Sequence, residues 1–235
     1  MIDFFISTLF NLMLYYFIAT VIAFGLISTS GKFISIHKNI PVRKDYIREV
    51  KFSMLSLLIF TTIATILYQT KVLDYTTLYY DVSKYGWLYY IGIIPAMLLL
   101  YDLYFYCTHR IIHHKKLFNI VHLVHHKSKY VSPLSALSMH PIEAIINHGY
   151  LVLLLFTIPL HASHVYIWVA TTILYTTYLH LGIELYSEKF LNTKIGKFIY
   201  TATTHSEHHI KFKGNYGFYT LIWDKLFKTV RAKHA

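Results

Sequence analysis

The sequence predicts an all-α integral membrane protein with four to five transmembrane helices and a histidine-rich helical cap on the cytoplasmic side. Two observations support this fold class. Hydrophobic residues make up 55% of the 235 residues and charged residues only 14%, so the chain is more apolar than a soluble domain. In addition, most of the 16 histidines are concentrated in short clusters that follow long apolar blocks.

Five apolar blocks define the expected helices: 4–27, 52–68, 87–107, 145–160 and 164–181. A spanning helix needs about 17–25 residues, so the first and third blocks are the safest spans. The last two blocks are separated only by Leu160–Ser163 and are predicted to form one tight hairpin, which leaves four or five crossings. The first block begins with Asp3 and lacks a basic segment and a cleavage site. We therefore expect a permanent helix there and no removable signal peptide.

Basic residues are distributed unevenly among the connecting loops. Six Lys and Arg fall in 31–51, two in 69–86, five in 108–143 and nine in 182–235, which accounts for all 22. If the three richer loops share one side of the membrane, the positive-inside rule places them in the cytoplasm. The net charge of +11 then reflects orientation and attraction to lipid headgroups, and no nucleic-acid partner is expected. The expected location is a bacterial inner membrane or the endoplasmic reticulum.

The helices and the cap are expected to form one structural unit. Residues 1–97 are predicted to be N-terminal transmembrane helices, and 98–235 to carry the histidines. Within the second part, 189–199 has an apolar stripe flanked by lysines, which predicts a helix lying in the membrane interface. Cys107 is the only cysteine, which excludes an internal disulfide, a paired-cysteine redox site and a four-thiolate cluster. Any electrons must therefore come from another protein.

Three histidine clusters carry the candidate chemistry. They are His109-x3-His113-His114, His122-x2-His125-His126 and His205-x2-His208-His209. Residues three and four apart share a helical face, so each cluster can direct two or three ring nitrogens at one point. Imidazole suits iron, zinc, copper and nickel, and nine ligands are too many for one ion. The clusters therefore predict a site for two metals.

Longer motifs surround these clusters. They are Asp102-x6-His109-Arg110-x2-His113-His114, Asn119-x2-His122-x2-His125-His126, His140-Pro141-x-Glu143, and Thr204-His205-Ser206-x-His208-His209-x2-Phe212-x2-Asn215-Tyr216-Gly217 with Trp223-Asp224-x-Leu226-Phe227. In order, spacing and flanking residues they resemble the fatty acid hydroxylase/sterol desaturase superfamily over about residues 98–230. The resemblance implies a membrane-bound di-iron oxygenase with O2 as co-substrate, although zinc can replace iron in a purified sample. The implied ligands are His109, His113 or His114, His122, His125, His126, His205, His208 and His209.

The resemblance also points to His180, at the end of the last apolar block, as a further ligand. Some relatives carry another histidine four residues later, where this chain has Glu184. Glu184 is then either a carboxylate ligand, or the second ion has one more open position.

Three further residues near the clusters have two interpretations each. Asp102 lies two turns before His109, inside an apolar span where a carboxylate is costly unless partnered. An acid that orients a metal ligand is favoured there over a structural pair with a Tyr or Arg. His140 and Glu143 begin the next helix and either stabilise its N-terminus or act at the metal. The other histidines are predicted to be interfacial polar residues outside the site: His37, His148, His161, His164 and His234.

The resemblance implies an O2-dependent oxidoreductase that hydroxylates or desaturates a sterol or fatty acyl chain. An external donor, such as a cytochrome b5 or a ferredoxin with its reductase, would supply electrons. The lipid is expected to reach the metals through an apolar tunnel. Its predicted wall is Tyr101, Tyr104, Phe105, Tyr106, Tyr175 and Tyr178. The alternatives are a membrane metal-binding or transport protein without redox catalysis, and a non-catalytic scaffold around zinc.

Overall fold

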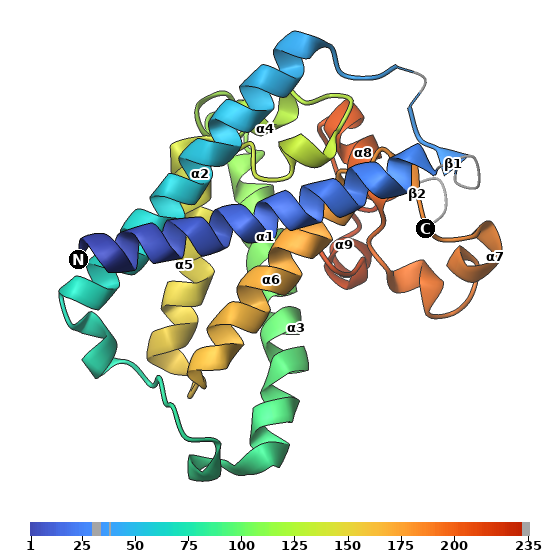
Figure 1. Ribbon diagram of the computed structural model, residues 1–235. Helices are drawn as coiled ribbons and strands as arrows, with labels where there is room; N and C mark the ends of the chain where they lie inside the picture. Colours follow the sequence, from blue (N-terminus) through green and yellow to red (C-terminus); the bar gives the residue numbers. More distant parts are fainter. Residues whose placement is uncertain (30–33, 38, 232–235) are drawn as a thin grey trace.

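The computed structural model describes residues 1–29, 34–37 and 39–231 and is mostly helical (Figure 1). The long helices are α1 (Ile2–Ser28), α2 (Arg43–Gln69), α3 (Gly86–Ile112), α5 (Pro141–Thr157) and α6 (Ala162–Leu179). The short helical elements are η2 (Val72–Tyr75), η3 (Val82–Lys84), η4 (Phe118–His122), α4 (Leu123–His126), η5 (Pro133–Ser135), α7 (Glu188–Leu191), η6 (Gly196–Phe198), α8 (Ala202–Lys211) and α9 (Ile222–Leu226). Among the described residues, the one sheet pairs β1 (Ile34–Ser35) antiparallel with β2 (Ile183–Glu184).

Three helices are long and apolar enough to cross a membrane: α1, α2 and α3, each of 27 residues. Helix α2 begins nine residues before the apolar block at 52–68, because the Asp45 carboxylate accepts the Val42 N–H and starts the helix within polar sequence. Helices α5 and α6 are joined by only four residues, 158–161, and Tyr150 of α5 meets Trp168 of α6 at a ring centroid distance of 5.8 Å, as the predicted hairpin requires (Figure 1). The number of crossings and the orientation in the membrane remain predictions.

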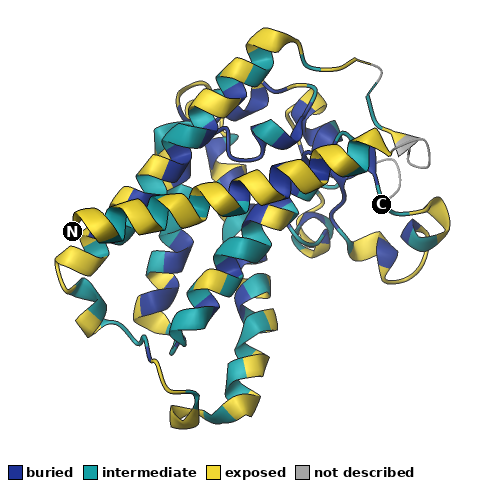
Figure 2. Cartoon of the chain, viewed as in Figure 1, coloured by how far each residue is buried: buried dark blue, intermediate teal, exposed yellow. Residues whose placement is uncertain are grey.

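The outer faces of the long helices are apolar and exposed. Figure 2 shows exposed residues along the whole of α1. Phe10 and Phe17 are each 64% exposed, whereas the face of α1 turned inward carries the small residues Ala19, Thr20 and Ala23. An exposed apolar surface of this length is unfavourable in water and matches a helix covered by lipid.

An aromatic core joins α3, α5 and α6 to the C-terminal part of the chain. Tyr101 of α3 meets Tyr150, Trp168 and Phe218 at ring centroid distances of 5.0, 5.5 and 5.1 Å. All three contacts are edge-to-face, an arrangement that aromatic pairs favour. The core therefore fixes the C-terminal segment around Phe218 against the end of the bundle where the histidines lie.

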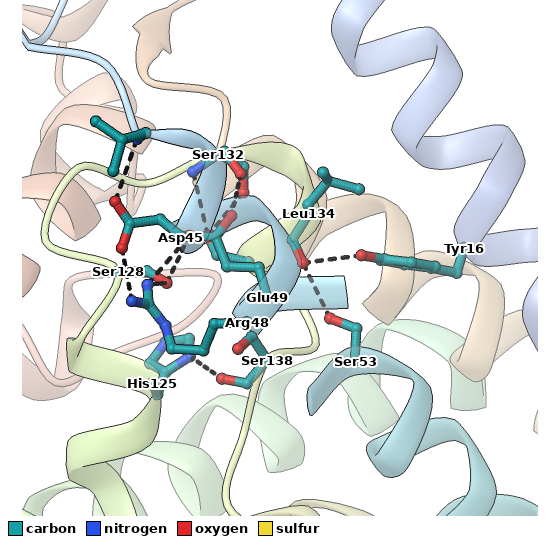
Figure 3. Close-up of polar contacts among 12 residues, drawn as sticks. Tyr16, Asp45, Arg48, Glu49, Ser53, His125, Ser128, Ser132, Leu134 and Ser138 are labelled. Carbon is teal, nitrogen blue, oxygen red and sulfur yellow. Dashed lines mark hydrogen bonds and ion pairs between the residues drawn. The ribbon is translucent and has the colours of Figure 1, made fainter. Parts of the chain in front are cut away.

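Helix α2 holds the segment that follows the second histidine cluster (Figure 3). Glu49 is fully buried, and its two carboxylate oxygens accept the hydroxyl protons of Ser128 at 2.7 Å and Ser132 at 2.6 Å. Arg48 reaches the same carboxylate at 3.7 Å. A buried carboxylate is costly unless it is paired and hydrogen-bonded, so these contacts keep the charge in place and tie the segment to α2.

Two further contacts complete this attachment. The hydroxyls of Tyr16 in α1 and Ser53 in α2 both donate to the Leu134 carbonyl, at 2.8 and 2.9 Å (Figure 3). The same segment ends at Ser138, whose carbonyl accepts the ring N–H of His125. The N-terminal helices therefore position a stretch of chain that contacts a candidate metal ligand.

The predicted interfacial helix over 189–199 is wrong. The chain forms only the short elements α7 and η6 there, because the Thr193 hydroxyl donates to the Phe190 carbonyl at 2.7 Å and accepts the Gly196 N–H at 3.0 Å. Such side-chain bonds compete with those of a helix. The turn is so tight that a Cβ on Gly196 would clash with the Phe190 carbonyl oxygen. Ile195 is still 73% exposed, so an apolar surface remains on this segment.

Candidate metal centre

Nine histidines from the ends of α3 and α6 and from η4, α4 and α8 meet at one end of the bundle. Among the described residues they form two groups, and the candidate ligand atoms of each group lie within 4.8 Å of one another. All are buried except His113, which is half-buried. The five-histidine group is His109, His113, His122, His126 and His208, and the four-histidine group is His125, His180, His205 and His209.

The adjacent histidines of the second and third clusters separate into different groups. His125 and His126 are neighbours in α4, and His208 and His209 are neighbours in α8. Successive residues of an α-helix are rotated by about 100°, so adjacent side chains cannot face the same point. Each of these helices therefore supplies both groups and holds them next to each other.

In the five-histidine group, most rings have an anchored Nδ1 atom. The Nδ1 atom of His109 lies 3.0 Å from the Tyr216 carbonyl, and that of His113 lies 3.1 Å from the Phe212 carbonyl. The Nδ1 atom of His208 lies 2.7 Å from the Gly214 carbonyl, and that of His122 lies 2.8 Å from a Glu143 carboxylate oxygen. Because backbone carbonyl oxygens only accept, the Nδ1 atoms of His109, His113 and His208 carry the proton, and their Nε2 atoms present a lone pair. The candidate ligand atoms of the five rings lie within 4.8 Å of one another, and a cation among them would stabilise these converging lone pairs.

Neutral rings cannot satisfy the four-histidine group either. His125 and His180 donate from Nδ1 to the carbonyls of Ser138 and Thr176, at 3.2 and 2.7 Å, so their Nε2 atoms carry lone pairs. Hydrogen bonds to those lone pairs would need Nε2–H on both His209 and His205, at 3.1 and 3.2 Å. The Nε2 atoms of His205 and His209 are themselves 3.0 Å apart, so two N–H groups would then face each other. A metal ion resolves the conflict, because the Nε2 atom of every ring then provides a lone pair to the ion.

The spacing and the protonation of the rings also suit metal ions. Nitrogens bound at about 2.0–2.1 Å and at right angles lie about 3 Å apart, which matches the 3.0–3.2 Å separations between neighbouring Nε2 atoms. Burial lowers the pKa of His125 and His208 to about 4 and that of His180 to about 3. These rings are therefore neutral near pH 7. The buried Nε2 of His208 has no hydrogen-bond partner among the described residues, as expected of an atom reserved for a ligand.

His140 fits the interpretation as a helix cap, whereas Glu143 fits the interpretation as a residue beside a metal ligand. The His140 ring accepts the Ile142 N–H at 3.3 Å and caps α5, with Pro141 as the first helical residue. Glu143 is buried one turn later and contacts His122 at 2.8 Å. A carboxylate in this position orients a ligating histidine and makes its other nitrogen more basic.

Asp102 has a different partner from the predicted one. Its buried carboxylate accepts the backbone N–H groups of residues 218–220, at 2.7 to 3.2 Å, and the Thr220 hydroxyl proton, and it hydrogen-bonds to none of the described histidines. Asp224 holds the preceding residues in the same way, through the Tyr216 N–H at 2.9 Å. The Tyr216 carbonyl receives His109, so Asp102 acts on the histidines only through this turn.

Two other candidate ligands lie outside both groups. The Glu184 carboxylate accepts the Thr203 N–H at 3.1 Å and hydroxyl proton at 2.7 Å, and so anchors the start of α8. His114 is exposed beyond the end of α3, and its ring accepts the Lys116 N–H at 3.4 Å. Of the pair His113 and His114, the geometry favours His113.

The fatty acid hydroxylase family profile matches residues 94–229, which is more than half of the chain. The chain belongs to the fatty acid hydroxylase family. The match confirms the resemblance that the histidine motifs indicate and coincides closely with the expected range.

Several relatives of this family member are named for sterol oxidation. Lathosterol oxidase of Rattus norvegicus is 28% identical over 182 residues, 76% of this chain and 59% of the relative. A Delta(7)-sterol 5(6)-desaturase of Schizosaccharomyces pombe is 27% identical over 158 residues, 67% of this chain and 50% of the relative. Methylsterol monooxygenase 1 of Rattus norvegicus is 30% identical over 136 residues, 57% of this chain and 45% of the relative. The chain thus spans about half the length of these relatives. No solved structure matches it.

In this fatty acid hydroxylase family member, a largely apolar cavity lies beside both histidine groups, here called the inner cavity. Its wall includes His109 and His122 of the first group and His125, His180 and His205 of the second. The remaining wall is Leu12, Phe60, Tyr101, Phe105, Ala136, Leu137, Met139, Glu143, Asn147, His148, Trp168, Val169, Thr172, Ile173, Thr176 and Phe218. Of the predicted wall residues, Tyr101 and Phe105 line this cavity, whereas Tyr104, Tyr106, Tyr175 and Tyr178 do not. The metal centre therefore faces a space suited to a hydrophobic molecule.

The histidines predicted to lie outside the site have several different environments. His161 and His164 cap the start of α6, where their rings accept the backbone N–H groups of Ser163 at 3.2 Å and His161 at 3.0 Å. His148 does not fit the predicted interfacial position, since its ring lines the inner cavity. His234 lies outside the described residues.

Proposed function

We propose that this chain is a membrane-bound, O2-dependent lipid oxidoreductase with two iron ions. The observation that carries the proposal is the pair of buried histidine groups, in which His208 Nε2 has no partner among the described residues and the Nε2 atoms of the four-histidine group cannot all be satisfied without a cation. One ion would be held by His109, His113, His122, His126 and His208, and the other by His125, His180, His205 and His209. Zinc would bind the same nitrogens in a purified sample.

When bound, two ferrous ions would act together with O2 and two electrons from an external donor. They would supply the chemistry that breaks an unactivated C–H bond. The chain's own residues orient the imidazoles and shape the space for the lipid. The carbonyls of Tyr216 and Ser138 fix which ring nitrogen of His109 and His125 faces the ions, and the Glu143 carboxyl group lies 2.8 Å from the Nδ1 of His122. The apolar wall of the inner cavity, including Phe105 and Phe218, excludes water and places a hydrophobic chain against them.

The proposed substrate is a sterol or a fatty acyl chain, and the reaction is hydroxylation or desaturation. The names of the relatives favour a sterol. The two reactions share the first C–H cleavage and differ in whether oxygen is added to the carbon or a second hydrogen is removed. The placement of the lipid in the inner cavity therefore selects the outcome.

The surface beside His113 suits an external electron donor, such as a cytochrome b5 or a ferredoxin with its reductase. A surface pocket reaches His113, and its lining includes Lys115, Lys213 and Arg231 but no acidic residue among those described. Such a cationic surface attracts an acidic carrier protein and speeds its association. Together with the positive-inside pattern of the loops, this supports a donor that approaches from the cytoplasm.

A metal transporter is less consistent with the arrangement. Transport would need polar groups spaced along a path between the two membrane faces. Here the nine histidines gather at one end, and the space beside them is lined by apolar residues such as Leu137, Met139 and Ile173.

Lipid mass spectrometry of cells with and without the chain tests the proposed function. The expected result is a lipid that loses two hydrogens or gains one oxygen when the chain is expressed. The same change should be missing with the His208→Ala variant, which removes one ligand of the five-histidine group. An unchanged lipid profile in cells whose purified protein contains two iron ions would contradict the proposal.

A further inference from the structure

A second apolar cavity, here called the outer cavity, lies between α1, α2, α5 and α6. Four residues line both this cavity and the inner cavity: Leu12 of α1, Phe60 of α2, His148 of α5 and Val169 of α6. Each comes from the interior of a different long helix. These four residues therefore lie where the two cavities adjoin, and they are here called the neck.

The outer cavity is itself suited to lipid. Its wall is mostly apolar and includes Phe4, Leu67, Leu78 and Leu155, and it extends along α1 and α2, two of the helices that are long enough to span a membrane. Two of the neck residues, Leu12 and Phe60, precede the part of the chain that matches the family profile. The N-terminal helices therefore add to the family domain one half of a passage that this domain does not form alone.

The length of the passage can be measured along α5. Glu143, which contacts His122, and Leu155, which lines the outer cavity, are twelve residues apart. At 1.5 Å per residue this is about 18 Å, and His148 lies about 7.5 Å from the level of Glu143. A long or rigid hydrophobic molecule with one end beside the histidines must therefore pass the neck.

His148 is the polar residue of the neck. Its ring stacks on Phe60, with centroids 5.0 Å apart and planes inclined by 17°. Neither ring nitrogen hydrogen-bonds to any of the residues that the structure describes, although the side chain lines both cavities. A polar ring inside an apolar helix is costly unless it has a partner. The partner that fits is a polar group of the molecule in the passage.

We propose that Leu12, Phe60, His148 and Val169 form the neck of a lipid passage, and that His148 hydrogen-bonds a hydroxyl or carbonyl oxygen of the bound lipid. This deepens the proposed function and rests on it, because the reactive carbon would lie in the inner cavity. The hydrogen bond sets how far the lipid reaches past the neck, and therefore which carbon faces the metals. His148 is thus a specificity-determining residue for lipids with an oxygen at a fixed distance from the reactive carbon.

The passage is tested with photoreactive cholesterol and photoreactive palmitate as probes, on iron-loaded protein in detergent. Val169→Trp fills the neck, and Leu174→Trp is the matched control, because Leu174 lies on the same helix, is 50% exposed and lines neither cavity. In the parent and the control, we expect labelling of peptides from both cavities. In Val169→Trp, labelling of Ile173 and Thr176 in the inner cavity should fall about tenfold, while Phe4 and Leu67 in the outer cavity remain labelled.

Labelling of the inner cavity by photoreactive cholesterol would indicate that the bound lipid is a sterol, and labelling by photoreactive palmitate that it is an acyl chain. Labelling of the inner cavity by neither probe in the parent, or equal inner labelling in Val169→Trp, would overturn the passage.

The hydrogen bond is tested by binding matched lipids with and without the oxygen: cholesterol against its 3-deoxy analogue, and hexadecanol against hexadecane. A hydrogen bond is worth roughly a fivefold preference, so we expect the parent to bind the oxygen-bearing member of one pair about fivefold more tightly. His148→Phe keeps the stacked ring and should abolish the preference, whereas His148→Gln should restore part of it. Iron content is measured in each variant and should not change.

These measurements involve no turnover, so they separate the two proposals. A preference that persists in His148→Phe overturns the role of His148 and leaves the oxidase proposal intact. A preference that disappears in His148→Phe supports the role of His148, even if the chain produces no oxidised lipid. The absence of oxidised lipid would count only against the oxidase proposal.

Discussion

The two histidine groups differ in what surrounds them. The five-histidine group contains the half-buried His113, and a cationic surface pocket reaches it. The four-histidine group is buried throughout, and three of its members, His125, His180 and His205, line the inner cavity. We infer a division of labour in which electrons arrive beside the first group, whereas the second is reached only from the lipid side.

The groups also differ in how their rings are fixed. Anchors for the five-histidine group come mainly from the turn at Phe212–Tyr216, which the buried Asp224 carboxylate holds through the Tyr216 N–H, while Asp102 holds the adjoining residues 218–220. In the four-histidine group, His125 depends instead on segment 128–138, which Glu49 attaches to α2, whereas His180 donates to the Thr176 carbonyl of α6. Substitutions at these two supports should therefore disturb different metal sites.

The largest expected effect comes from removing one histidine ligand from either group. His208→Ala should empty the site of the five-histidine group and His125→Ala that of the four-histidine group, and each should abolish turnover, because loss of one imidazole leaves an incomplete ligand set. Iron per chain, measured by elemental analysis of protein purified from membranes, should fall in both. His114→Ala is the control and should match the parent. Retention of the parental iron content in either variant would refute the assignment of that group.

Glu143→Gln should have the next largest effect, and it should fall on the five-histidine group. A neutral amide no longer supports His122 as a carboxylate does, and loss of such a partner typically lowers metal affinity about 10–100-fold. Competition with a chelator measures the affinity of each ion separately. An equal loss at both ions would show that Glu143 supports the whole fold and not His122 in particular.

Glu49 should act on the other group. Glu49→Ala leaves the hydroxyls of Ser128 and Ser132 buried without their acceptor, which costs about 1–3 kcal/mol for each group left unpaired. The absorption spectrum of a cobalt-substituted sample should change at the four-histidine group, where His125 loses its fixed position. Glu49→Gln retains one acceptor and should restore most of the parental spectrum. A spectrum that is unchanged in Glu49→Ala would remove this link.

The smallest perturbation tests which side of the membrane the cationic pocket faces. In a Cys107→Ser background, cysteines are introduced as Thr77→Cys and Val230→Cys. An impermeant thiol reagent applied to intact cells should label only position 77, because 69–86 is expected outside and 182–235 inside. Equal labelling of both positions, or labelling of position 230 alone, would reverse the orientation and place the donor surface on the wrong side.

The sequence predicts the histidines well because their chemistry is local. Spacings of three and four residues on short helices place rings on one face, so eight of the nine histidines in the two candidate groups follow from the three clusters. His180 has no such neighbour and is recognised only through the family resemblance. The choice between His113 and His114 depends on how the chain leaves α3, since the helix ends at Ile112 and only His113 turns toward the other rings.

Contacts between distant segments account for what the sequence does not predict. Asp102 shares a helical face with His109, yet its partners are residues 218–220, more than a hundred positions later. Glu49 gives no local signal, because its partners Ser128 and Ser132 lie 79 and 83 residues away. The neck likewise depends on four helices meeting in space.

Iron stoichiometry in the parent and in His180→Ala tests the central claim most directly. His180 is the one proposed ligand outside the three clusters, and its buried ring lies 3.2 Å from His205 within the four-histidine group. We expect two iron ions per chain in the parent and in the His114→Ala control, and about one in His180→Ala. A parent that binds a single iron ion, or a His180→Ala variant that keeps two, would contradict the two-metal centre described above.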